Sequence, residues 1–114
     1  MEKSWQNLMK TKPEVLQAFS AARDNIQNFH EKQVPINLET KIGDNVLGLK
    51  FVPFDRVGLY VPGGKALYPS TVLMGAIPAK IAGVKDITII SPPNNETGRV
   101  SEIVKAMGFL VKAD

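Results

Sequence analysis

The sequence predicts an α/β protein in which an N-terminal helix precedes an incomplete parallel βαβαβ unit. An amphipathic stripe early in the chain supports the helix, and short apolar runs that alternate with helical patterns support the unit. Strands that alternate with helices favour parallel pairing through crossover helices. The predicted strands are apolar throughout, which is typical of a sheet covered on both faces.

The N-terminal helix is expected between residues 11 and 34. Its apolar residues recur every three or four positions, at Val15, Phe19, Ala22, Ile26 and Phe29. Thr11 and Glu14 have the spacing of a capping box at its start, and Pro35 is expected to end it. Such a stripe must pack on other apolar surface, either the chain's own core or a second helix in a dimer.

Residues 36–56 are expected to form short extended pieces. Residues 36–40 alternate weakly between apolar and polar, and Gly43 to Asn45 is typical of a turn. The apolar stretch from Val46 to Val52 predicts a strand, which Pro53 would end.

The first half of the parallel unit is predicted over residues 57–83. Residues 57–61 form a short apolar run typical of a buried strand, and a helix capped by Ser70 is expected to follow. Pro78 lies inside the helical pattern and predicts a kink or an early break. Gly83 is expected to end the helix.

The second half of the unit begins with the β-branched run at residues 87–90, which predicts a strand. The next helix is expected from helical spacing at Val100, Ile103, Val104 and Met107. Gly108 is expected to stop this helix. Residues 109–111 would then open a third strand with no helix after it.

Composition limits the classes of function. The 114 residues suffice for one domain or for a piece of something larger, and they include no cysteine and one histidine, His30. Disulfides, thiolate metal sites and histidine-rich metal sites are therefore not expected, and a reducing cytoplasm suits the chain. The predicted helix places His30 near its C-terminus, where we expect a surface residue rather than a ligand.

The net charge of +3 is spread along the chain instead of forming a basic cluster. Each third of the sequence carries one more basic than acidic residue, so we expect no nucleic-acid partner. No apolar run is long enough to span a membrane, and the first residues lack the apolar region of a secretory signal.

The glycine-containing turn after the first strand of the unit is a candidate ligand site. Gly63 and Gly64 follow the strand, and open α/β sheets bind ligands where strands end. Backbone N–H groups of such a turn can hold an anion, and Lys65 would add a positive charge, although a purely structural turn is the alternative. Tyr60 and Tyr68 flank the turn, either as core residues or as ligand-facing rings.

The run from Asp55 to Met74, continued from Ala76 to Val84, closely resembles the histidinol dehydrogenase family. Its central part reads Val-Gly-Leu-Tyr-Val-Pro-Gly-Gly-Lys over residues 57–65. Residues 25–33 and 91–93 extend the resemblance, which has no gaps and covers most of the chain.

The resemblance implies an enzyme that oxidises L-histidinol to L-histidine through histidinal, with two hydride transfers to NAD. It also implies a zinc-dependent cytoplasmic homodimer with two incomplete Rossmann-like domains, similar to aldehyde dehydrogenases. Tyr60 matches the tyrosine of the family's NAD site. The Gly-Gly-Ala-Gln and Gly-Pro-Gly-Asn segments, which carry other NAD contacts of the family, are absent from this sequence.

The resemblance further implies that this chain corresponds to the N-terminal portion of such an enzyme. Residues 1–56 would hold the N-terminal helix and the start of the first Rossmann-like domain, and residues 57–114 the truncated start of the second. One histidine cannot supply both the family's zinc ligands and its catalytic histidine. We therefore expect no catalytic residue and no metal ligand in this chain.

Three functions remain open from the sequence. The chain could carry part of the NAD-facing edge and be inactive alone, with weak NAD binding at most. It could instead be a non-catalytic module that forms a homodimer or pairs with a longer enzyme. The turn at residues 63–65 could also simply bind a nucleotide or an anion.

Overall fold

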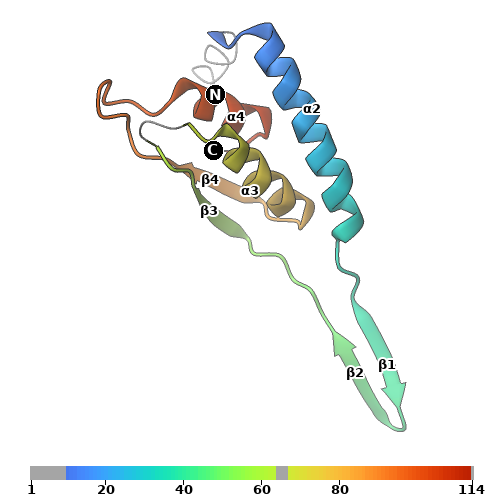
Figure 1. The fold of residues 1–114 in the computed structure, drawn as a ribbon. Helices are drawn as coiled ribbons and strands as arrows, with labels where there is room; N and C mark the ends of the chain where they lie inside the picture. The colour runs from blue at the N-terminus through green and yellow to red at the C-terminus, as the bar shows by residue number, and fades with distance from the viewer. Residues whose placement is uncertain (1–9, 64–66, 114) are drawn as a thin grey trace.

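The computed structural model describes residues 10–63 and 67–113. Their elements, in chain order, are α2 (Pro13–His30), the short 3-10 helix η1 (Glu31–Gln33), β1 (Leu38–Ile42), β2 (Asn45–Leu49), β3 (Arg56–Tyr60), α3 (Pro69–Ile81), β4 (Asp86–Ile90) and α4 (Glu102–Leu110). The molecule extends 66 Å along its longest axis, because β1 and β2 project from the body that the other elements form (Figure 1). The predicted α/β class, with an N-terminal helix and a parallel βαβ unit, is confirmed.

The parallel sheet consists of β3 and β4, with Arg56 opposite Asp86 and Tyr60 opposite Ile90. Side chains alternate between its two faces, and the face that includes Ile87 carries the buried or partly buried positions. Helices α3 and α4 cover that face, whereas the residues of the opposite face are exposed. The prediction of a sheet covered on both faces was therefore wrong for the described residues.

The core lies between the covered face of the sheet and the helices α3 and α4. Its largest fully buried side chains are those of Val61, Val72, Leu73 and Met107. Helix α2 lies along α3 (Figure 1) and packs its stripe onto this core through Phe19, Ala22 and Ile26. The stripe is confirmed over those positions, but Phe29 at its end is exposed.

The N-cap of helix α2 lies one residue later than predicted. Lys12 occupies the N-cap position, so the prediction of Thr11 as the cap was wrong. Pro13 is the first residue of the helix. Its fixed φ suits the first turn, and it lacks only an N–H that would have no partner within the helix at this position. The helix ends at His30, and η1 fills the interval before Pro35.

Helix α3 departs from the sequence prediction at its start and agrees at its end. Tyr68 is the N-cap residue, not Ser70, and the helix continues through Pro78 to Ile81 without the expected early break. Gly83 has a φ of +98°, and its N–H donates to the carbonyl of Lys80 at 2.9 Å. Glycine tolerates this conformation, so the predicted stop is confirmed.

Helix α4 occupies the residues for which a third strand was predicted, and that prediction was wrong. Gly108 lies inside the helix and is buried. A Cβ there would lie 3.0 Å from Cδ1 of Ile89, so glycine lets α4 approach β4 closely. The helix ends instead at Leu110. Lys112 follows its C-cap residue, has a φ of +54° and donates its N–H to the carbonyl of Phe109 at 3.0 Å.

Replacing Lys112 with glycine is expected to stabilise the chain. Lys112 is exposed and adopts a left-handed conformation that costs a non-glycine residue about 1 kcal/mol. We expect Lys112→Gly to raise the free energy of unfolding in urea by about 0.5 kcal/mol after the larger entropy of unfolded glycine is subtracted. Lys105→Gly, in the interior of α4, is the control and should lower it by about 1 kcal/mol. Loss of stability in Lys112→Gly would contradict the strain argument.

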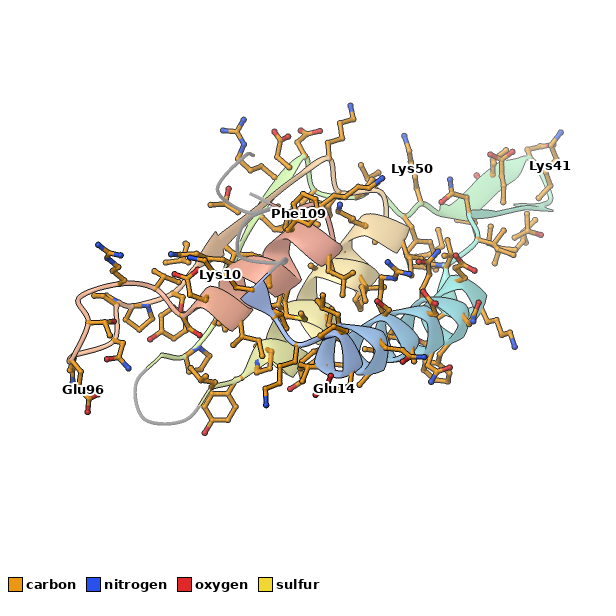
Figure 2. All side chains as sticks on the ribbon, turned by 90° about the horizontal axis from the view of Figure 1, so that it is seen from above. Lys10, Glu14, Lys41, Lys50, Glu96 and Phe109 are labelled. Atoms are coloured by element: carbon orange, nitrogen blue, oxygen red, sulfur yellow. The ribbon has the colours of Figure 1, made fainter. Side chains whose placement is uncertain are left out.

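Strands β1 and β2 form an antiparallel hairpin, with Leu38 opposite Leu49 and Ile42 opposite Asn45. The predicted turn is confirmed at Gly43, which has a φ of +61°. The second strand ends at Leu49, before the predicted boundary at Val52. Figure 2 shows Lys41 in this hairpin and Glu96 in the loop after β4 at opposite ends of the molecule. No helix in the described part of the chain is long and apolar enough to cross a membrane.

Candidate functional site

The carboxyl ends of β3 and β4 meet at one edge of the parallel sheet, as the parallel register requires. The pairing continues one residue further, because the N–H of Val61 donates to the carbonyl of Ile90 at 2.8 Å. Loops leave both strands at this edge and lead to α3 and α4. This is the edge at which open α/β sheets bind ligands.

Gly63 lets the two loops approach each other at this edge. A Cβ at Gly63 would lie 2.8 Å from the carbonyl oxygen of Pro92 and 2.8 Å from its Cγ. No real side chain tolerates such contacts, so the approach of the loops depends on glycine at this position. Gly64 and Lys65, the rest of the predicted anion-binding turn, lie outside the described residues.

Tyr60 is the last residue of β3 and belongs to the uncovered face of the sheet. It is 62% exposed, and its cross-strand neighbour Ile90 is exposed as well. Gly58 precedes Tyr60 on the same face and has no side chain that would stand above the sheet. The ring of Tyr60 is therefore available to a planar ligand, and Tyr60 is not the core residue that the sequence left as an alternative.

A crevice of about 490 Å³ lies between the loops at the same end of the molecule. Leu67 from the loop after β3 lines it together with residues that precede and begin α4, which are Asn94, Thr97, Arg99, Val100, Ser101 and Glu102. This volume lies within the range of about 300–1,000 Å³ that is common for small-molecule sites. The second predicted ring, that of Tyr68, is exposed at the start of α3 but does not line the crevice.

Asn94 organises the loop that carries Arg99 into the crevice. Its Oδ1 accepts hydrogen bonds from the N–H groups of Glu96 at 2.8 Å and Thr97 at 3.2 Å. Its own N–H donates to the carbonyl of Arg99 at 2.9 Å, while Gly98 turns the chain with a φ of +62°. Arg99 was not among the predicted site residues, although an asparagine four residues before a glycine is a usable turn signal.

The described residues do not fit a zinc site. They contain no group of three or more His, Cys, Asp or Glu side chains that could hold a metal ion. His30 lies at the end of α2, as predicted, and its ring contacts that of Phe29 edge-on at 5.3 Å between centroids.

Comparison with known proteins places the chain in one family. The family model described as histidinol dehydrogenase matches residues 1–114. The histidinol dehydrogenase of Leptospira interrogans is 52% identical over 88 residues, which are 77% of this chain and 21% of that protein. That of Pseudomonas syringae pv. tomato is 43% identical over 108 residues, which are 94% of this chain and 24% of the relative.

A solved structure agrees with the sequence comparisons. The crystal structure of histidinol dehydrogenase from Elizabethkingia anophelis superposes with a TM-score of 0.88 at 30% identity, over 98% of this chain and 26% of that one. The chain thus spans about a fifth to a quarter of the length of the proteins that it matches. With the family model matching its whole length, the chain belongs to the histidinol dehydrogenase family.

Proposed function

We propose that this chain forms one wall of the NAD site of a histidinol dehydrogenase, an enzyme that oxidises L-histidinol to L-histidine through histidinal in the cytoplasm. The position of Tyr60 carries the proposal. Its exposed ring stands at the carboxyl end of β3, on the open face and at the ligand-binding edge of the sheet. Family membership supports the choice of NAD as the ligand.

In the proposed role, this chain positions the cofactor and does not move protons. NAD, when bound, supplies the hydride acceptor for oxidation of the alcohol. The ring of Tyr60 packs against a flat part of the cofactor and limits its orientation. Close packing of Gly63 against Pro92 holds the two loops together at the edge where β3 ends in Tyr60.

We propose a separate role for Arg99 at the crevice. Arg99 lines the crevice and belongs to a loop that Asn94 organises, so its guanidinium could reach the phosphates of a dinucleotide bound there. Arginine binds phosphate oxygens with paired hydrogen bonds. Arg99 would thus hold the charged part of the cofactor while Tyr60 holds a flat part.

Tyr60→Ala is expected to weaken NAD binding by about two- to twelvefold, since aromatic stacking contributes about 0.5–1.5 kcal/mol. Titration followed by NMR should give a millimolar dissociation constant for the unmodified chain, because one ring and one crevice bury little of a dinucleotide. Tyr60→Phe should retain most of the affinity. Tyr68→Ala is the control and should change it less than about twofold.

Two results would overturn these assignments. Saturable NAD binding that is unchanged in Tyr60→Ala would remove the assignment of Tyr60.

The chain alone should not reduce NAD with histidinol and zinc, because its single histidine cannot serve both metal binding and proton transfer. Turnover by the purified chain would contradict the proposal that the chemistry resides outside it.

A further inference from the structure

The loop that joins β4 to α4 depends on one residue for its shape. This loop covers residues 91–101 and protrudes from the body of the molecule (Figure 1). Residues 95–99 are exposed, so packing contributes little to their order, and the conformation of this segment depends on its own hydrogen bonds. All but one of the hydrogen bonds within the loop involve Asn94, which is only half-buried itself.

The backbone and the side chain of Asn94 have different tasks in the loop. The backbone closes its base, because the N–H of Asn94 donates to the carbonyl of Arg99 and its carbonyl accepts from the N–H of Gly98 at 2.8 Å. The side chain fastens its tip, where Oδ1 accepts from the N–H groups of Glu96 and Thr97. Any residue can make the backbone bonds, but only a short side chain with an acceptor can make the others.

The loop controls Arg99 through its backbone alone. The N–H of Arg99 donates to Oγ1 of Thr97 at 3.4 Å, and its carbonyl accepts from Asn94. Its guanidinium forms no hydrogen bond and no ion pair with any residue in the described part of the chain. The guanidinium is therefore available to an anion in the crevice that Arg99 lines.

An acidic side chain of the crevice is already paired. Glu102 lines the crevice together with Arg99, and its carboxylate would oppose the binding of an anion. However, its Oε1 lies 3.1 Å from Nζ of Lys105, one helical turn further along α4. This ion pair offsets the charge of Glu102, so the positive charge of Arg99 remains effective in the crevice.

We propose that Asn94 is a positioning residue for phosphate binding, because its side chain fixes the loop that holds Arg99 at the crevice. The inference rests on the proposed role of Arg99 in binding the phosphates of NAD, and it assigns no contact between Asn94 and the ligand. A loop that is ordered before binding spares the ligand the entropic cost of ordering it. Without the Oδ1 acceptor, Arg99 samples more positions and binds phosphate more weakly.

Inorganic pyrophosphate, the charged centre of a dinucleotide, is the probe for this inference. Its binding to the chain is followed by NMR at the Nε–H of Arg99 and at the amides of residues 94–99. We expect Arg99→Ala to weaken binding at least about tenfold, because it removes a charged donor of phosphate hydrogen bonds. Asn94→Ala should weaken it about three- to tenfold, through the looser loop.

The double variant separates positioning from a direct effect. If Asn94 acts only through Arg99, then Asn94→Ala combined with Arg99→Ala should bind pyrophosphate within about twofold of Arg99→Ala alone. A general loss of structure would instead add the two losses. Asn94→Ser keeps a neutral acceptor that forms the same kind of turn more weakly, so it should recover part of the affinity that Asn94→Ala loses.

Asn95→Ala is the matched control. Asn95 is the same residue type at the next position, it is exposed, and it forms no hydrogen bond with a described residue. Its replacement should change pyrophosphate affinity less than about twofold. Circular dichroism of all variants checks that the body of the chain remains folded.

Three outcomes would overturn the inference: no saturable binding of pyrophosphate, equal losses in Asn94→Ala and Asn95→Ala, or losses that add in the double variant. Pyrophosphate has no ring that could stack on Tyr60, so its binding is measured independently of the cofactor assignment of Tyr60. Pyrophosphate binding that depends on Asn94 and Arg99 as expected, together with NAD binding that is unchanged in Tyr60→Ala, would support the positioning role and count against the proposed function.

Discussion

Leu73→Ala is expected to lower the free energy of unfolding by about 2–5 kcal/mol, which is the range for a fully buried leucine. Leu73 is 1% exposed and lies in the middle of α3, where it faces the core formed with the sheet and α4. Removing its isobutyl group leaves a cavity that helices fixed by their own packing cannot close completely. Since small domains have only about 5–15 kcal/mol of stability, the variant should unfold at a much lower urea concentration.

Met74→Ala provides the matched control for this prediction. Met74 follows Leu73 in the same helix but is 54% exposed. Its truncation should change the free energy of unfolding by less than about 0.5 kcal/mol, because surface substitutions in a helix have small effects. Urea titrations followed by circular dichroism measure both variants. Similar losses in the two would mean that α3 does not present Leu73 to a packed core.

The parallel βαβ unit was predictable because its signals are local. Residues 57–61 and 87–90 form short apolar runs, and both overlap observed strands. The glycine at position 83 marked the end of α3 because a left-handed residue is needed there, and glycine adopts that conformation without strain. Each of these features depends on a few adjacent residues, so the sequence contained the information.

The prediction of a third strand failed because a glycine can either end a helix or allow close packing inside one. Gly108 was interpreted as a helix stop, but its role is to let α4 approach Ile89 of β4. That requirement arises from tertiary packing and is not visible in local periodicity. The left-handed residue that follows the end of α4 is Lys112, and a lysine in this conformation cannot be recognised from the sequence.

The strand end at which the candidate site lies could be predicted from the sequence, but the crevice could not. The position of Tyr60 followed from the run that precedes it, and the structure places its ring on the open face. This face is uncovered because α3 and α4 both lie on the other side of the sheet, and the sequence does not show on which side each helix lies. Arg99 lines the crevice on the loop that Asn94 organises, and this arrangement is not visible in local periodicity.

Gly63→Ala is expected to destabilise the chain by about 1–3 kcal/mol, the usual cost of forcing extra volume into a packed site. The new Cβ would lie 2.8 Å from the carbonyl oxygen of Pro92. A backbone oxygen cannot rotate away as the end of a side chain can, so one of the two loops must move. The amide resonances of residues 91 and 94 should therefore shift together with those around residue 63.

Gly58→Ala is the control for Gly63→Ala. It shows whether the loss of stability comes from the contact with Pro92 or from replacing any glycine in or near β3. Its Cβ would lie 3.4 Å from Cδ1 of Ile90, which is an ordinary van der Waals contact. Because glycine inside a strand is unfavourable by about 0.5–1 kcal/mol, Gly58→Ala should be neutral or slightly stabilising. The two variants should thus change stability in opposite directions or differ by more than about 1 kcal/mol. If Gly63→Ala were as stable as Gly58→Ala, the two loops at the carboxyl edge of the sheet would not be held together by this contact.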